Sequence, residues 1–452
     1  LCLTFISTTF IACEDDKDDG KYDKTPIKVT QIYLQDTESS VPDRPVDYAR
    51  LGQTLRIEGS GLLGTKKIYV NGYDTYFNQA LMTDNNMWLQ LNSKTPVMNA
   101  EEDVRNTIRF VKTDSNDETI EFIIRAASPA ATHLSNTLPK ANEVVYVYGT
   151  NLHETVKVTL PDGTEITDGI TSHIDGEWYS FTMPSGSNAS GSIYSEGANG
   201  IAATPAYFNY TQGLILDFDG TGAQGFWSWT ETGSMADASD LANDPAGTGR
   251  GLCAQIIPER LREAGIAAGK PRASEYWTAG NDDPADDWTR FYSEIPAETP
   301  INEVAFQFDI LVPEGWSETG HIQICLINNF NFGGIGSDDD GKRTAFLAPY
   351  IVDGAMETFQ TAGWTTVTIP FSEFGYYAKN PDDLDLTFSN VVEDRNAASY
   401  RNFGMGFVNT DFTLGGVEVK ATTATAKIYT DNWRVVPCAK ISISDYPEDD
   451  EE

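Results

Sequence analysis

The sequence predicts an all-β protein of several domains, in which two small β-sandwiches precede a larger β-sandwich. Three observations predict this class: apolar and polar residues alternate along much of the chain, the first half repeats itself, and aromatic residues gather in the second half. The chain has 452 residues, which is too many for one hydrophobic core. We therefore expect about two to four domains.

The chain is strongly acidic, with 67 Asp and Glu residues against 31 Lys and Arg residues and a net charge of −36. Nucleic-acid binding needs clustered basic side chains that displace counterions from phosphates. A chain of this charge also repels acidic lipid headgroups and acidic polysaccharides. We therefore expect no nucleic-acid partner and a neutral ligand.

The start of the chain is typical of the end of a bacterial export signal. Residues 1–12 carry no charge, and as a helix they would span about 18 Å, too short for a bilayer core of about 30 Å. Residues 10–13 resemble a lipobox, and residues 14–19 resemble the acidic signal that directs Bacteroidota lipoproteins to the cell surface. We therefore expect a signal tail at 1–13, lipidation of Cys13 that anchors the protein in the outer membrane, and an acidic linker at 14–25.

Two segments of the first half match each other at an offset of 90 residues. Residues 55–62 align with residues 145–152, and each is followed by a second apolar strand that ends at a glycine turn. Short alternating segments that break at such turns are typical of small β-sandwiches. The pattern resembles the bacterial immunoglobulin-like/TIG domain, which implies one such domain at 26–126 and another at 127–211.

Each copy has one tryptophan at the same place, Trp88 in the first and Trp178 in the second. An exposed tryptophan can form a platform for a ligand, but a position shared by two repeats favours a role in the core. We therefore expect both indoles in the cores, and we expect the two sandwiches to form a stalk.

The second half continues in strands and holds seven of the nine tryptophans. Five runs have strand character: 304–310, 322–326, 364–370, 405–408 and 426–436. Only 258–268 suggests a short helix. We therefore expect one jelly-roll-type β-sandwich at 212–438, with Trp364 and Trp433 in its core.

Three motifs of this half resemble one known family. Residues 216–219, 363–374 and 429–437 are similar to the carbohydrate-binding domain of the B-type surface glycan-binding proteins of Bacteroidota. Members of that family also carry a lipobox, tandem immunoglobulin-like domains and a terminal β-sandwich, so the resemblance covers nearly the whole chain. It implies a non-catalytic lipoprotein that holds a plant or microbial polysaccharide beside a TonB-dependent transporter and a SusD-like partner.

The segment around 276–292 contains the residue types that a sugar receptor needs. A pyranose ring presents an apolar face and a rim of hydroxyl groups, so it binds flat aromatic rings beside amide, carboxylate or guanidinium groups. We interpret this Gly-, Pro- and Asp-rich segment as a binding loop that uses Tyr276, Trp277, Asn281, Trp288, Arg290 and Tyr292. Trp227 and Trp229 share one strand face, where core and platform roles stay equally open, and Tyr350 is a further candidate.

Catalysis is the main alternative, because a jelly roll with this many carboxylates can supply the pair that glycoside hydrolysis needs. The sequence lacks the G-x-S-x-G, H-E-x-x-H, P-loop and Rossmann motifs, and its four histidines have no ligand or triad spacing. We therefore predict that the protein is not an enzyme. A hydrolase or lyase, and a surface adhesin or scaffold of a transporter complex, stay as alternatives.

We expect no cofactor. Residues 337–341 and the pair Asp217 and Asp219 could hold a structural calcium ion, but the first segment lacks the bidentate Glu of an EF-hand loop, so a solvated turn is favoured. Residues 439–452 form an acidic tail, and 445–452, with six acids, is expected to be disordered. The three later cysteines show neither a zinc nor a disulfide pattern: Cys253, Cys325 and Cys438.

Overall fold

The computed structural model describes residues 24–446 apart from seven segments: 38, 113–115, 226–234, 258–271, 329–334, 336–342 and 380–384. Strands form most of the regular structure, so the prediction of an all-β protein is confirmed. The chain divides into two compact units. The first comprises Leu1–Ser128, Ala198–Gly200 and Ser444–Glu452, and the second comprises Pro129–Gly197 and Ile201–Ile443.

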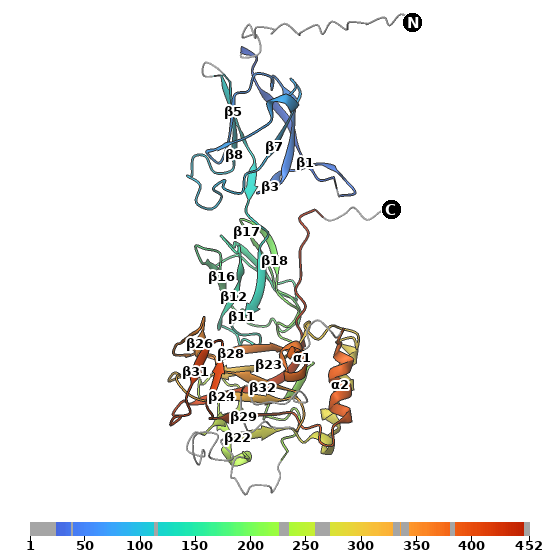
Figure 1. The fold of residues 1–452 in the computed structure, drawn as a ribbon, viewed down its shortest axis with the longest axis vertical. Helices are drawn as coiled ribbons and strands as arrows, with labels where there is room; N and C mark the ends of the chain where they lie inside the picture. Colours follow the sequence, from blue (N-terminus) through green and yellow to red (C-terminus); the bar gives the residue numbers. More distant parts are fainter. Residues whose placement is uncertain are drawn as a thin grey trace, which may run out of the picture. The chain divides into compact units, whose positions relative to one another are not determined.

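The first unit is a β-sandwich of two antiparallel sheets (Figure 1). One sheet has the order β2 (Asp43–Pro45), β1 (Lys28–Gln35), β4 (Thr54–Ser60) and β7 (Asn86–Gln90). The other has the order β6 (Tyr73–Thr75), β5 (Lys67–Val70), β8 (Thr107–Val111) and β9 (Asp117–Glu121). Three short elements complete it: β3 (Tyr48–Arg50), β10 (Ile123–Arg125) and the 3₁₀ helix η2 (Gln79–Leu81). Alternate residues such as Leu55, Ile57 and Ile68 face inward and are fully buried.

The second unit begins with a sandwich of the same design. One sheet has the order β11 (Ala130–Leu134), β12 (Val144–Thr150), β16 (Trp178–Thr182) and β15 (Thr171–Ser172). The other has the order β14 (Glu165–Ile166), β13 (Lys157–Thr159), β17 (Tyr194–Gly197) and β18 (Gly200–Ala203). Val145, Val147 and Tyr179 fill the core, so the two halves of the predicted repeat fold alike.

One glycine in each central strand explains part of the repeat. A Cβ atom on Gly59 would lie 2.2 Å from the carbonyl oxygen of Lys28, and a Cβ atom on Gly149 would lie 1.9 Å from that of Ala130. Each strand pair is irregular at this point, and the partner backbone approaches too closely for any side chain.

Trp88 and Trp178 lie half-buried on the outer faces of their sheets, so the prediction of core positions is wrong for both. The N–H of Gly59 donates to the carbonyl oxygen of Asn85, and the N–H of Gly149 donates to that of Glu177. The offset between the repeats is therefore 90 residues at the glycines but 92 residues on the strands that carry the tryptophans. A shift of two residues preserves the face. Both indoles therefore stay outside, although they are not structurally equivalent.

The rest of the second unit is a larger sandwich (Figure 1). Its large sheet has the order β20 (Ala242–Asn243), β21 (Leu252–Ile256), β32 (Ile428–Pro437), β23 (Val304–Leu311) and β28 (Thr365–Pro370), with β19 (Leu214–Leu216) also paired to β32. Its small sheet has the order β22 (Arg272–Trp277), β29 (Gly404–Val408), β24 (His321–Cys325) and β25 (Thr344–Leu347). Two hairpins follow: β26 (Ile351–Val352) with β27 (Ala355–Met356), and β30 (Phe412–Leu414) with β31 (Val417–Val419).

The core of this sandwich lies between the two sheets. Phe306 and Phe308 of β23 and Ile322 of β24 belong to one buried cluster, which also holds Trp433. Trp433 is fully buried and Trp364 is 5% exposed, so the prediction that both are buried is confirmed.

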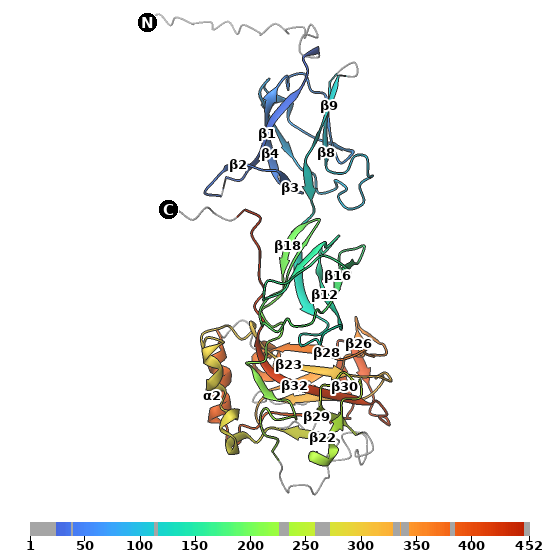
Figure 2. The same ribbon diagram turned by 180° about the vertical axis from the view of Figure 1, so that it is seen from behind.

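Two α-helices, α1 (Gly375–Lys379) and α2 (Phe388–Ala397), belong to this sandwich, and α2 runs along one side of it (Figure 2). The sequence suggested a helix only at 258–268, which lies outside the described residues. A capping box of Thr387 and Asn390 starts α2. The described part of this sandwich also contains the 3₁₀ helices η4 (Ala238–Asp240), η7 (Gly280–Asp282), η8 (Pro284–Asp286), η9 (Trp288–Ser293) and η10 (Phe371–Glu373).

A buried ion cluster joins the two sandwiches of the second unit. Asp309 on β23 accepts hydrogen bonds from Arg250 at 2.6 Å and from Arg434 at 3.0 Å, and all three side chains are nearly inaccessible to solvent. Burial alone would raise the pKa of Asp309, but the two guanidinium groups hold that pKa below its usual value. Arg434 also donates to the Thr137 hydroxyl at 2.7 Å, so the cluster reaches into the smaller sandwich.

The start of the acidic tail is ordered, which corrects the expected disorder at 445–452. The carboxylate of Asp445 accepts hydrogen bonds from the Arg50 guanidinium, and the ring of Tyr446 stacks on Tyr48 with centroids 5.4 Å apart. These contacts lie within the first unit. Residues 447–452 lie outside the described residues.

The predicted lipid anchor also lies outside the described residues, because the description begins at residue 24. The signal tail, the lipidation of Cys13 and the acidic linker therefore stay predictions. In the part of the chain that the structure describes, no helix is long and apolar enough to cross a membrane.

Candidate functional site

Tyr276 and Trp277 lie in strand β22 rather than in the predicted loop. As neighbours on a strand they face opposite sides of the small sheet. Tyr276 belongs to the main core, where its hydroxyl donates to the carbonyl oxygen of Gln255 at 3.0 Å. It supports the sheet and has no ring face open to a ligand.

Trp277 lies on the outer face of the small sheet, in a separate cluster with Cys325 and Val408. A Cβ atom on Gly404 would lie 2.1 Å from the Trp277 ring, so the indole covers the backbone of the neighbouring strand. Its N–H donates to the carboxylate of Glu275 at 3.4 Å. The side chain is only 3% exposed, so a sugar cannot stack on it in this conformation.

The same outer face carries further buried polar groups. Gln323 and His321 occupy alternate positions on β24, in phase with Cys325, and both are fully buried. Neither ring nitrogen of His321 has a hydrogen-bond partner in the described part of the chain. Burial lowers the pKa of His321 to about 3, so the imidazole is neutral at pH 7.

Trp288 is a core residue, which corrects its assignment to an exposed loop. It is 1% exposed in η9 and packs against Phe371 and Phe403. The guanidinium carbon of Arg395 lies 3.8 Å from the centre of its ring, and Arg395 is paired with Asp286 at 2.9 Å. These contacts leave no ring face for a sugar.

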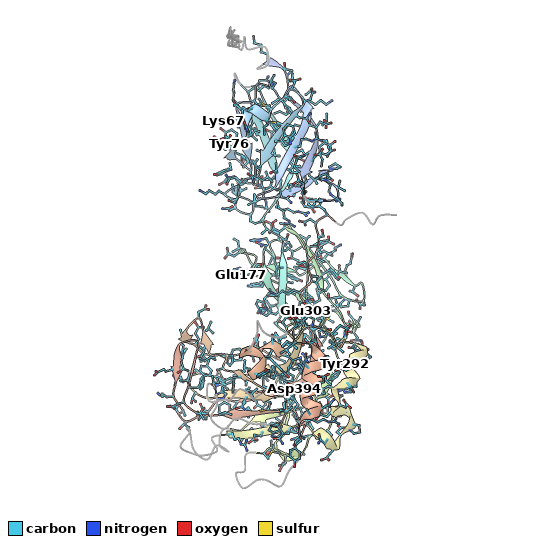
Figure 3. The ribbon with its side chains drawn as sticks, turned by 45° about the vertical axis from the view of Figure 1, so that its right-hand side comes forward. Lys67, Tyr76, Glu177, Tyr292, Glu303 and Asp394 are labelled. Carbon is cyan, nitrogen blue, oxygen red and sulfur yellow. The ribbon has the colours of Figure 1, made fainter. Side chains whose placement is uncertain are left out.

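Three further predicted residues bind other parts of the protein. Arg290 donates to the carbonyl oxygens of Ala285 and Leu214 at 2.7 and 2.6 Å. Tyr292 is half-buried beside α2, edge-on to Phe388, and Figure 3 shows its position on that side of the sandwich. Tyr350 is buried and donates to the Gly320 carbonyl at 2.7 Å.

Asn281 is exposed and belongs to a polar surface at one end of the small sheet. Its amide donates to the carbonyl oxygen of Ser399 at 3.0 Å, and its side-chain oxygen accepts from the N–H of Arg401 at 3.3 Å. Between these two contacts stands Tyr400, which is 61% exposed. The amide of Asn281 thus holds the backbone that displays the Tyr400 ring.

Two other asparagines contact Tyr400 or its neighbour Arg401. The backbone N–H of Asn328 donates to the Tyr400 carbonyl at 3.2 Å, and Arg401 donates to the side-chain oxygen of Asn396 at 3.5 Å. We call this group the Tyr400 surface: Asn281, Asn328, Asn396, Tyr400 and Arg401. Arg401 also lies 4.0 Å from Asp287, so its charge is partly balanced.

The topology explains why these segments meet. Trp277 ends β22, Gly404 begins β29 and Cys325 ends β24, and these three residues pair across one end of the sheet. The residues of the Tyr400 surface follow or precede them by three or four positions, except Asn396 at the end of α2. Tyr400 was not among the predicted site residues, although its ring lies between polar neighbours, which is the same signal that marked the predicted ones.

Other predicted positions carry less information about a site. Trp227, Trp229 and residues 337–341 lie outside the described residues. The carboxylate of Asp217 accepts three backbone N–H groups of its own turn, and that of Asp219 accepts the N–H of Leu252. In the described part of the chain, no group of three or more His, Cys, Asp or Glu side chains could hold a metal ion.

The C-terminal sandwich matches a known family model. Residues 208–437, about half of the chain, match the model described as the surface glycan-binding protein B xyloglucan binding domain. The chain belongs to this family. The matched residues run from β19 to β32, so they contain both Trp277 and the Tyr400 surface.

Two relatives agree with this family assignment. An IPT/TIG domain-containing protein of Bacteroides ovatus is 25% identical over 330 residues, which cover 70% of this chain and 54% of that protein. The chain thus spans about half the length of this curated relative. The crystal structure of the surface glycan-binding protein PbSGBP-B from Prevotella bryantii has a TM-score of 0.62 at 20% identity and covers 92% of this chain and 99% of that one. The fold of this family is therefore shared along most of the chain.

Proposed function

We propose that this protein holds a neutral polysaccharide at the cell surface without cleaving it, through the C-terminal sandwich. The observation that carries the proposal is the family match over 208–437, because the matched sandwich also displays Tyr400 beside amide and guanidinium groups. An aromatic ring can stack on the apolar face of a sugar, and the surrounding groups can bond to its hydroxyls.

The ligand class follows from charge and from the family description. The net charge of −36 disfavours acidic polymers, and the description names xyloglucan, which is a neutral glucan. The site we propose is the Tyr400 surface. Trp227 and Trp229 stay predicted binding residues.

The affinity for a short oligosaccharide should be low. One or two stacked rings with a few hydrogen bonds correspond to a Kd on the order of 0.1–1 mM. A long polymer offers repeated sites to a surface-held receptor, which raises the effective concentration. Weak binding therefore suits capture of a polymer that is to be degraded and imported.

The remaining parts of the proposal concern the membrane. A lipid on Cys13 anchors the protein in the outer membrane. There it works beside a TonB-dependent transporter and a SusD-like protein. The lipobox resemblance supports the anchor and the family resemblance supports the neighbours. Globomycin, which blocks lipoprotein signal cleavage, should leave an uncleaved precursor, and Cys13→Ser should release the protein from membranes.

Affinity electrophoresis tests the binding function. The purified protein should be retarded in a native gel that contains xyloglucan, and Tyr400→Ala should weaken the affinity about fivefold, because one stacked ring contributes about 1 kcal/mol. The matched control is Tyr76→Ala, which removes an 80% exposed tyrosine from the first unit and should change nothing. Figure 3 shows Tyr76 on that unit.

Two results would contradict the proposal. Equal retardation of the Tyr400→Ala and Tyr76→Ala variants would exclude the Tyr400 surface as the site. Steady release of reducing ends or unsaturated products by the wild-type protein would favour the hydrolase or lyase instead.

A further inference from the structure

The outer face of the second immunoglobulin-like sandwich carries a row of aromatic rings. We call it the aromatic strip: His133, Tyr146, Tyr148, His173 and Trp178. Tyr146 and Tyr148 alternate on β12 with the buried Val145 and Val147, so both rings point outward. His133 is exposed on β11, and Trp178 is half-buried on β16.

The rings are in contact along the row. His133 stacks on Tyr148 with centroids 4.7 Å apart and an interplanar angle of 15°, and Tyr148 is 6.2 Å and 19° from Tyr146. Trp178 meets Tyr146 edge-on at 5.2 Å, and His173 lies 5.4 Å from Trp178. Three nearly parallel rings therefore stack on one another along the row, with an indole and an imidazole beside them.

The first sandwich shows that this face does not have to be aromatic. In the aligned strand, Arg56 and Glu58 stand where the second sandwich has Tyr146 and Tyr148. Arg56 pairs with Glu58 at 2.9 Å and with Asp43 at 2.7 Å, so charged groups cover that face. Both sandwiches fold alike, so the aromatic residues are not required by the fold. Clustered exposed aromatic rings mark interaction sites.

The charges around the strip restrict its partner. Tyrosine and tryptophan are uncharged at pH 7, and burial lowers the pKa of His133, which keeps its imidazole neutral. Asp175 and Glu177 lie 4.0 and 3.9 Å from the Nδ1 atom of His173, at one end of the row. Figure 3 shows Glu177 on this sandwich. Anionic ligands are therefore disfavoured.

The polar groups of the strip suit a carbohydrate. The indole N–H of Trp178 is a hydrogen-bond donor. The tyrosine hydroxyls and imidazoles add donors and acceptors at the ring edges. A stable protein partner would use about 20–30 residues a side, many more than this row of five side chains.

We propose that the aromatic strip is a second binding site for neutral polysaccharide. This inference rests on the proposed function, because its ligand is another stretch of the polymer that the C-terminal sandwich holds. The ion cluster around Asp309 joins this sandwich to the C-terminal one, so both sites belong to one compact unit. Two sites on one unit raise the avidity for a long chain without raising the affinity of either site.

The test replaces two residues of the aromatic strip with the residues at the aligned positions of the first sandwich. Tyr146→Arg with Tyr148→Glu should fold, because the homologous strand carries Arg and Glu at the aligned positions. In native gels with xyloglucan, this double variant should bind the polymer about tenfold more weakly than the wild type. Calorimetry with a xyloglucan oligosaccharide should give two sites for the wild type, and one site for either the double variant or Tyr400→Ala.

The outcomes separate the two proposals. A double variant that binds like the wild type, with one oligosaccharide site in both, would overturn the strip and leave the proposed function intact. A wild type that binds no neutral polysaccharide would overturn both. Loss of binding by the double variant together with a lowered Tm would indicate misfolding. The single variant Tyr146→Ala, which removes a 36% exposed ring, would then decide. Unchanged polymer binding by that variant would overturn the proposal for the aromatic strip.

Discussion

Two regions of the C-terminal sandwich use polar side chains in opposite ways. Around Asp309, a carboxylate and two guanidinium groups are buried and bonded to one another. At the Tyr400 surface, an aromatic ring faces solvent beside amides that bond largely to the backbone. Buried groups of the first kind hold the fold, whereas exposed groups of the second kind are available to a ligand. Substitutions in the two regions should therefore separate stability from binding.

The largest effect is expected for Asp309→Asn. It leaves the charges of Arg250 and Arg434 buried without their carboxylate, and such a loss costs about 3–5 kcal/mol of unfolding free energy. Urea unfolding measures the change. The control is Asp411→Asn, whose exposed pair with Lys420 should contribute nothing measurable. Equal stability of the two variants would refute the structural role of the cluster.

Trp288→Ala should come next, with a loss of about 3 kcal/mol, because it leaves a cavity beside Arg395. The fraction that remains folded should bind glycan as the wild type does. Tyr400→Ala should show the reverse, with a change in unfolding free energy within about 0.5 kcal/mol and weakened binding. A Trp288→Phe variant that folds normally but loses binding would show that the buried indole contacts the ligand after all.

A pH dependence of stability is expected from Asp431. Burial, followed by the charge of Asp309, raises the pKa of Asp431 to about 8, whereas an unfolded Asp titrates near about 4. Between these values the folded state binds the extra proton, so this group's contribution to the unfolding free energy falls as pH rises towards 8. Asp431→Asn removes this contribution. The difference between wild type and variant should change across pH 5 to about 8 in thermal unfolding, and a constant difference would contradict the shift.

Strand β23 of the large sandwich was predictable because its sequence alternates apolar and polar residues, although all eight of its residues are buried. Residues 304–310 alternate, and β23 lies there. Strand β22 was mistaken for a loop, because all but its first residue are buried and Ser274 has a φ of +51° at an irregular pairing. Such a strand has no alternation to detect. Helix α2 was missed for a related reason, since its inner face includes Arg395, whose partner Asp286 is 109 residues away.

The candidate site was predicted only in part. Of the residues predicted to bind a sugar, Asn281 lies at the Tyr400 surface. Tyr276, Trp288 and Tyr350 satisfied the same rule but are buried. A rule based on neighbouring residues cannot separate these cases, because it does not include the segments that cover a ring.

Composition, alternation and self-similarity were sufficient for the all-β class, the two repeated sandwiches, the family resemblance and the expectation of a neutral ligand. These properties depend on residues that are close together in the chain, or on the composition and net charge of the whole chain. The tertiary structure alone decided which aromatic rings are accessible, because burial depends on packing between distant segments. It brought Asn281 to Tyr400, enclosed Trp288 beside Arg395, and placed Tyr146 and Tyr148 on an outer face where the first repeat carries an ion pair.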